Sequence, residues 1–158
     1  MTETALPALE GPAPDFSLPA AGGGTLSLAD LAGKTLVLYF YPKADTSGCT
    51  KEALAFTEHK DAFEAAGAVV VGVSKDPVKK LERFVDKHGL GVSLVSDAEH
   101  DLCERFGVWV EKSMYGKKYM GIERSTFLID GAGVLRREWR KVKVPGHAEA
   151  VLEAVRAL

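Results

Sequence analysis

Two apolar runs, separated by a helical stretch, constrain the fold of this chain more than any other feature. Residues 35–41 (TLVLYFY) and 68–74 (AVVVGVS) are almost entirely apolar, β-branched or aromatic. Runs of this kind are typical of strands buried on both faces of a sheet. Pro42 ends the first run, because proline has no N–H to donate to a sheet ladder. Between the runs, Phe56 and Phe63 recur at helical spacing, which predicts the order strand, helix, strand.

The rest of the chain continues this alternation of strands and helices. Such an order places helices on both faces of a sheet, and a closing hairpin makes the sheet mixed rather than all parallel. We therefore predict an α/β protein with a thioredoxin-like fold, in which helices flank a mixed central sheet. The expected elements are strands at 15–18, 92–95, 125–130 and 134–140, a helical turn at 27–31, and helices at 48–66, at about 77–87, from 96 to 106 and after 146.

Length and composition favour a single domain spanning residues 1–158, with about the first 8 residues flexible. Hydrophobic residues make up 46% of the chain and charged residues 27%, which is enough for a packed soluble core. The net charge of -2, with lysines and arginines spread along the chain, argues against nucleic acid or an anionic membrane as the main partner. We find no apolar run long enough to span a bilayer and no secretory signal, so we expect a cytoplasmic protein.

The cysteine and histidine content argues against a metal site or a structural disulfide. The chain has two cysteines, Cys49 and Cys103, and a cytosolic chain of this size does not need a disulfide for stability. Two cysteines without paired histidines fall short of a zinc site. We predict no metal and no cofactor. The histidines show no ligand spacing and are expected to be surface or capping residues; they are His59, His88, His100 and His147.

The segment around Cys49 is the strongest candidate for a reactive site. It joins the carboxyl end of a predicted central strand to a helix, and ligands bind at this edge of open α/β sheets. Cys49 falls in the first helical turn, where free backbone N–H groups and the helix dipole favour a thiolate. Lowering the pKa of a thiol from about 8.5 to about 6, so that it is mostly ionised at neutral pH, requires about 3.4 kcal/mol. A helix dipole typically supplies about 0.3–1 kcal/mol. A cation close to the sulfur is therefore required.

Arg124 is the best candidate for that cation. Lys43 and Lys51 are closer in sequence but are flexible and are expected to be solvated. Arg124 precedes the predicted strand at 125–130, and a charged residue at the entry to a buried strand often points into a cleft. The alternative is an ordinary surface charge at a strand end, and the local pattern alone leaves this open.

Two further residues of this loop, Thr46 and Pro42, fit a site built around a reactive thiol. Thr46 presents a hydroxyl across the loop three residues before Cys49, and Pro42 shields the sulfur and fixes the loop. If the substrate is a peroxide, rapid cleavage of its O–O bond needs groups aimed at the peroxide oxygens as well as a thiolate. The alternative is that Thr46 and Pro42 are turn residues and that Cys49 is a buried, inert cysteine.

Residues 42–49 (PKADTSGC) resemble the peroxiredoxin signature P-x-x-x-T-x-x-C, and the wider chain resembles the Q-type branch, also called bacterioferritin comigratory protein. The resemblance implies that Cys49 attacks the hydroperoxide and becomes a sulfenic acid. It implies that Thr46 and Arg124 polarise the peroxide and that Pro42 lines the pocket, with Glu52 orienting Arg124. The further segments that carry it are 13–19, 94–97, 106–109, 111–113 and 127–130.

One departure from the Q-type pattern concerns the resolving cysteine. Many members have a second cysteine five residues after the reactive one, where this chain has Leu54, and others have one in the helix around 77–87, where this chain has none. Cys103 is the only other thiol, and we interpret it as a packing residue. We therefore predict a one-cysteine peroxidase for hydrogen peroxide and organic hydroperoxides, reduced by thioredoxin or by a glutathione or glutaredoxin system.

Two other functions compete with this prediction. A thioredoxin-type oxidoreductase needs C-x-x-C, and Thr46 occupies the first of these positions. A peroxide sensor or redox relay using the same Cys49, with Cys103 as an atypical resolving cysteine, is left open by the sequence. By resemblance we expect a monomer, with a weak dimer as the alternative.

Overall fold

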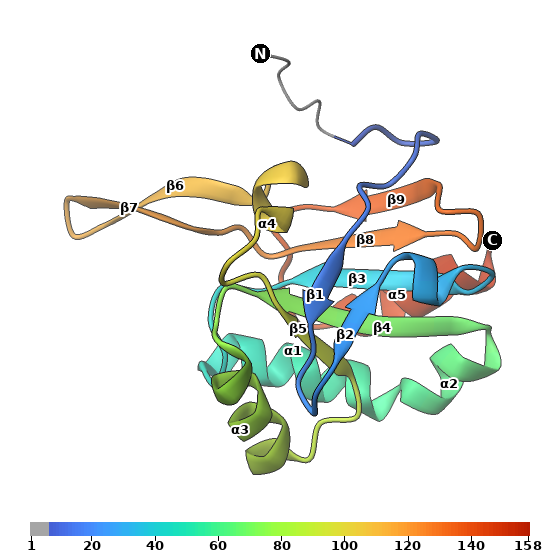
Figure 1. The fold of residues 1–158 in the computed structure, drawn as a ribbon, viewed down its shortest axis with the longest axis horizontal. Coiled ribbons are helices and arrows are strands. Elements are labelled where there is room, and N and C mark those ends of the chain that lie inside the picture. Colours follow the sequence, from blue (N-terminus) through green and yellow to red (C-terminus); the bar gives the residue numbers. More distant parts are fainter. Residues whose placement is uncertain (1–6) are drawn as a thin grey trace.

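The computed structural model describes residues 7–158, and a five-stranded mixed sheet lies at its centre (Figure 1). The strand order is β5–β4–β3–β8–β9, with β3, β4 and β5 parallel and with β8 and β9 antiparallel to their neighbours. This is the mixed sheet that the sequence predicted. The strands are β3 (Thr35–Phe40), β4 (Ala68–Ser74), β5 (Ser93–Ser96), β8 (Ser125–Ile129) and β9 (Leu135–Trp139).

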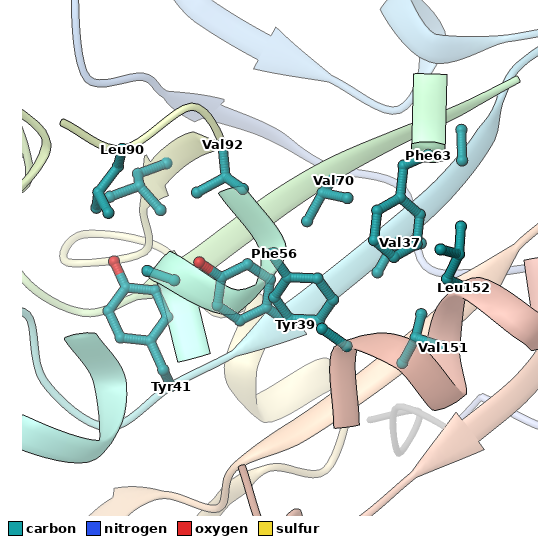
Figure 2. Close-up of a cluster of buried hydrophobic side chains, with 14 of the residues drawn as sticks. Val37, Tyr39, Tyr41, Phe56, Phe63, Val70, Leu90, Val92, Val151 and Leu152 are labelled. Carbon is teal, nitrogen blue, oxygen red and sulfur yellow. The ribbon is translucent and has the colours of Figure 1, made fainter. Parts of the chain in front are cut away.

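Helices pack against one face of the sheet and bury an aromatic core there (Figure 2). Successive strand residues point to opposite faces, so Tyr39 of β3 and Tyr41, which directly follows this strand, both point to this side. The ring of Tyr39 stacks on Phe56 with their centroids 4.8 Å apart. The covering helices are α1 (Ser47–Glu58), α2 (Lys60–Ala65), α3 (Val78–His88) and α5 (His147–Arg156).

A second core lies on the opposite face of the same sheet. Here β3 contributes Leu38 and Phe40, which pack with Phe106 and Phe127. Thinner elements cover this face: β1 (Ser17–Pro19), β2 (Thr25–Ser27), the 3-10 turn η1 (Ala29–Leu31) and the short α4 (Leu102–Arg105). The sheet therefore separates two apolar clusters, which matters for the two cysteines.

The single helix predicted at 48–66 is wrong, because α1 and α2 meet at a break at His59. No glycine or proline marks the break. The hydroxyl of Thr57 donates to the Ala53 carbonyl at 2.8 Å and accepts the N–H of Gly91 at 3.1 Å. Threonine hydroxyls bonded back to the helix in this way often bend it.

The predicted helix at 96–106 is also wrong over its first half, since α4 contains only Leu102–Arg105. The Asp97 carboxylate accepts the backbone N–H groups of Leu102 at 3.0 Å and Cys103 at 2.8 Å. Asp97 thus satisfies the free N–H groups of the helix start from five and six residues away, and the chain between forms a turn.

A hairpin that the sequence analysis missed projects from the molecule (Figure 1). It consists of β6 (Trp109–Met114) and β7 (Lys117–Ile122), joined by Tyr115 and Gly116. Both turn residues have positive φ angles, 52° and 77°, which suits the right-handed twist of a two-residue hairpin. Exposed side chains on both faces removed the alternation that marks a half-buried strand.

The sequence analysis also predicted a flexible N-terminal segment and no membrane-spanning run. The flexibility expected for about the first 8 residues falls mainly on residues 1–6, which lie outside the described residues. No helix within residues 7–158 is both long enough and apolar enough to cross a membrane.

Candidate active site

Cys49 lies in the first turn of α1, just beyond the carboxyl end of β3. Thr46 is the N-cap residue, with extended backbone angles (φ -90°, ψ 158°), and its carbonyl accepts the first helical N–H, from Thr50, at 2.9 Å. The side chain of Cys49 is buried, with 2% exposure. The thiol therefore sits among backbone N–H groups that have no partner within the helix.

The guanidinium of Arg124 contacts the sulfur directly. Its Nη2 donates to Cys49 Sγ at 3.3 Å, and its Nη1 donates to Glu52 Oε1 at 2.7 Å. The pairing of β3 with β8 sets Phe40 opposite Ser125. Arg124, one residue earlier, is thereby placed next to the end of β3 where the loop to α1 begins.

Gly48 makes room for this guanidinium. A Cβ atom at residue 48 would lie 3.2 Å from Arg124 Nη2, closer than an ordinary van der Waals contact. The sequence analysis did not give this glycine a role. The sequence did contain an indication of this role, because a glycine in the first turn of a helix lowers helix stability and often marks a place where another group approaches the backbone closely.

The Glu52 carboxyl and the Arg124 guanidinium form a largely buried pair. Glu52 has 1% exposure, and its Oε2 has no hydrogen-bond partner among the described residues. Burial raises the pKa of Glu52 to about 7, although Arg124 opposes this shift. Burial alone would lower the pKa of Arg124, but Glu52 and Cys49 raise it. The guanidinium is thus held as a cation between the two acidic groups.

Thr46 and Pro42 lie in the same loop, but neither is bonded to the sulfur. The Thr46 hydroxyl is exposed and donates to the Lys43 carbonyl at 2.8 Å. Pro42 is half-buried, while Lys43 and Lys51 are exposed. The structure therefore brings together Cys49, Arg124 and Glu52, and it places Thr46 at the rim of the loop.

Two aspartates that the sequence analysis did not assign to the site hold this loop. The Asp76 carboxylate accepts the backbone N–H of Ala44 at 2.7 Å. Asp45 has a positive φ of 62° and pairs with Lys87 at 2.9 Å and with His88 at 2.8 Å in the last turn of α3.

His147 corrects the expectation that the histidines are surface or capping residues. It is 7% exposed, and its Nε2 is 2.8 Å from Thr126 Oγ1. Burial, with a smaller effect from Arg124, lowers the pKa of His147 to about 4. Its packing against Phe56 and Trp139 keeps it in the core on the α1 side.

Cys103 is fully buried and lies in the other core cluster, beside Phe106 and Phe127. Burial and the nearby Asp97 carboxylate raise the pKa of its thiol. Both cysteines are free. Leu54, at the position where many Q-type proteins have a second cysteine, has 41% exposure on α1.

Metal ligands do not gather at this site. Within residues 7–158, no group of three or more histidine, cysteine, aspartate or glutamate side chains is placed to hold a metal ion. The side chain that contacts Cys49 Sγ is instead the Arg124 guanidinium, which also binds the Glu52 carboxyl.

Residues 9–138 match the AhpC/TSA family. The chain is also 52% identical over 140 residues to a putative peroxiredoxin bcp of Coxiella burnetii, with 89% of this chain and 93% of the relative covered. It is 50% identical to a peroxiredoxin Bcp of Xanthomonas campestris, covering 94% of each chain. The chain belongs to the AhpC/TSA family, in its Bcp or peroxiredoxin Q branch.

Solved structures of this peroxiredoxin branch have the same fold. Peroxiredoxin Q of Xanthomonas campestris superposes with a TM-score of 0.86 at 49% identity and 90% coverage of both chains. A mutant of PrxQ from Xylella fastidiosa gives a TM-score of 0.91 at 41% identity, covering 97% of this chain and 98% of the other. The predicted thioredoxin-like fold is confirmed, and so is the predicted enzyme class, a thiol-dependent peroxidase.

Proposed function

We propose that this peroxiredoxin reduces hydrogen peroxide and organic hydroperoxides through a sulfenic acid on Cys49. The observation that carries the proposal is the 3.3 Å contact between Arg124 Nη2 and Cys49 Sγ at the start of α1. A guanidinium and a helix N-terminus both stabilise a thiolate, which is the nucleophilic form of cysteine. The bacterioferritin comigratory protein of Xanthomonas campestris, 48% identical to this chain, has alkyl peroxide reduction activity, which supports organic hydroperoxides as substrates here.

The first step transfers one oxygen from the hydroperoxide to sulfur. The Cys49 thiolate attacks the terminal oxygen of ROOH, the O–O bond breaks, and the terminal oxygen stays on sulfur as the sulfenic acid. The alkoxide RO⁻ leaves and takes a proton from solvent to become the alcohol. Arg124 stabilises negative charge on sulfur before the step and on the leaving oxygen during it.

Thr46 and Pro42 shape the peroxide pocket in this proposal. The Thr46 hydrogen is already donated to the Lys43 carbonyl, so its oxygen has lone pairs free to accept a hydrogen bond. Thr46 therefore accepts from the terminal O–H of the peroxide and orients that oxygen toward Cys49. Pro42 lines the pocket, and Glu52 positions Arg124 through the 2.7 Å contact.

The sulfenic acid is then reduced by an external thiol, so the mechanism uses one cysteine of this chain. Cys103 is buried on the opposite face of the sheet, and residue 54 is a leucine. A disulfide requires Cα atoms within about 7 Å, and a sheet with packed side chains lies between the two thiols. We propose thioredoxin or a glutathione or glutaredoxin system as the reductant. We also propose that residues 1–158 form a single domain and that the protein is a monomer.

Peroxide turnover with a small thiol tests the proposal. The wild-type protein with dithiothreitol should consume hydrogen peroxide and cumene hydroperoxide catalytically, and Cys49→Ser should lose this turnover completely. Mass spectrometry after one equivalent of peroxide, with a sulfenate-trapping reagent, should find the adduct on Cys49. A Cys49→Ser variant with turnover near that of the wild type would refute the assignment. A wild-type protein that oxidises once but does not turn over would favour the sensor.

A further inference from the structure

The projecting hairpin has two faces with different chemistry. Residues opposite each other in an antiparallel pair share a face, so the register assigns each side chain of β6 and β7 to one face. We call the two faces of the hairpin the Lys112 face and the Glu111 face. The Lys112 face carries Val110, Lys112, Met114, Lys117, Tyr119 and Gly121, whereas the Glu111 face carries Glu111, Ser113, Lys118 and Met120 beyond the buried end of the hairpin.

Charge is balanced on the Glu111 face and unbalanced on the Lys112 face. Glu111 and Lys118 form an ion pair at 3.6 Å. Within the part of the chain that the structure describes, Lys112 and Lys117 have no carboxylate partner, and Lys112 instead donates to the Ile122 carbonyl. The Lys112 face therefore carries only positive charge.

The Lys112 face also exposes apolar surface. Met114 is 56% exposed and Tyr119 is 44% exposed, although a methionine side chain gains about 1.5–3 kcal/mol from full burial. Methionine and tyrosine next to unpaired lysines form a surface that complements an acidic partner with apolar groups.

This face begins at the edge of the proposed active site. The hairpin ends at Ile122, two residues before Arg124, and the Lys112 ammonium is bonded at that end. Burial and the Arg124 cation lower the pKa of Lys112, while Cys49 and Glu123 oppose this shift, so these groups lie within electrostatic reach of one another. From there the hairpin extends outward past the central sheet (Figure 1). A protein lying along the Lys112 face would have one end at Cys49.

We propose that the Lys112 face of the β6–β7 hairpin docks the protein that reduces Cys49, a small dithiol protein with acidic and apolar side chains around its reactive cysteine. The inference rests on the proposed function, because it requires an external thiol to reach a sulfenic acid. The partner's thiolate attacks the Cys49 sulfur, forming a mixed disulfide and releasing hydroxide, which is protonated to water. The partner's second cysteine then loses its proton to solvent and attacks the partner's first sulfur as a thiolate, which breaks the mixed disulfide, forms the partner's own disulfide and releases the Cys49 thiolate.

The two faces allow a matched experiment. The test variant combines Met114→Ser, Lys117→Glu and Tyr119→Ser, and the control variant combines Lys118→Glu and Met120→Ser on the Glu111 face. Neither variant changes the turn residues or the groups at Cys49. Peroxide turnover is measured with dithiothreitol and with an acidic thioredoxin kept reduced by its reductase and NADPH.

The proposal predicts that the test variant raises the KM for thioredoxin about tenfold or more, while its dithiothreitol-driven turnover stays within about twofold of the wild type. The control variant should stay within about twofold with both reductants. Added salt should raise the thioredoxin KM of the wild type more than that of the test variant, because the lost attraction is electrostatic. An unchanged thioredoxin KM, or an equal loss in the control variant, would overturn the docking surface.

Failure of the inference and failure of the proposed function are distinguishable. If the wild type turns over with dithiothreitol but not with the acidic thioredoxin, the docking proposal is wrong and the peroxidase assignment stands. If the wild type turns over with neither reductant, the proposed function itself fails.

Discussion

Cys49 and Cys103 lie on opposite faces of the central sheet, each within a different apolar cluster. Cys49 contacts the Arg124 guanidinium, whereas Cys103 is fully buried next to the Asp97 carboxylate. A carboxylate and an apolar environment disfavour a thiolate, and an unionised thiol is a poor nucleophile. The two cysteines are therefore in environments with opposite effects on reactivity.

Cys103→Ser should accordingly keep most peroxidase activity with dithiothreitol. The peroxide-treated wild type should contain a Cys49 sulfenic acid and no Cys49–Cys103 disulfide, as determined by non-reducing peptide mass spectrometry. The serine adds a buried hydroxyl, so thermal unfolding of the variant should be followed in parallel. Quantitative formation of that disulfide would contradict the one-cysteine mechanism and favour the relay with Cys103.

The close approach of Gly48 to Arg124 predicts opposite effects on stability and on activity. Gly48→Ala should gain helix stability of at most about 0.5–1 kcal/mol, because alanine loses less conformational entropy in a helix than glycine, and displacement of the guanidinium from its ion pair with buried Glu52 offsets part of this gain. The same methyl group would lie 3.2 Å from Arg124 Nη2 and push the guanidinium from the sulfur, so the rate of peroxide reduction should fall about tenfold. Urea unfolding and stopped-flow peroxide kinetics measure the two effects. A variant as fast as the wild type would show that this contact is not needed.

The exposed hydroxyl of Thr46 gives a prediction about substrate orientation. Thr46→Val removes the lone pairs that accept from the peroxide, and its peroxide reduction should be about 10–100-fold slower, in line with the loss of one oriented hydrogen bond in an active site. Thr46→Ser keeps the hydroxyl and should stay within a few-fold of the wild type. Equal rates for the serine and valine variants would mean that Thr46 only shapes the loop.

His147 predicts the pH dependence of stability. Its folded pKa of about 4 lies below the usual histidine value of 6.5, so the unfolded chain binds more protons between these pH values. Stability from this group is therefore present above pH 6.5 and is lost as the pH falls toward 4, by at most about 3 kcal/mol.

The comparison of wild type with His147→Gln isolates this effect, since glutamine can still bond to Thr126 but does not titrate. Urea unfolding from pH 4 to pH 7 should find that the wild type loses more stability toward acid than the variant. Parallel curves for the two proteins would show that His147 is already protonated or solvated in the folded state.

The sequence predicted most of the sheet because its strands are buried on both faces. The runs at 35–41 and 68–74 need no partner to be recognised, and β3 and β4 follow them closely. The hairpin of β6 and β7 could not be found in this way, because Met114, Tyr119 and Met120 are exposed and no buried face gives the strands a period. The helix break at His59 lies beside the hydrogen bond between Thr57 and Gly91, two residues that are 34 positions apart in the sequence.

The sequence also predicted part of the candidate site, namely the features that are local to Cys49. The strand, loop and helix start around Cys49 are local features, and the need for a cation followed from the limited strength of a helix dipole. That Arg124 is this cation depended on a resemblance, because the pairing of β3 with β8 is not visible in the sequence. The ties from Asp45 and Asp76 to the loop are equally long-range, and nothing near them in sequence indicated their partners.

We propose that the Arg124 guanidinium, through its 3.3 Å contact with Cys49 Sγ, stabilises the negative charge of the attacking sulfur and of the leaving oxygen. The most direct test is the second-order rate of hydrogen peroxide with Cys49 in the wild type, in Arg124→Lys and in Arg124→Gln, measured by stopped-flow at neutral pH on folded protein. Removing this donor should slow the glutamine variant about 100-fold or more, and lysine should restore only part of the rate because it lacks the planar fork. A glutamine variant that reacts as fast as the wild type would contradict the account.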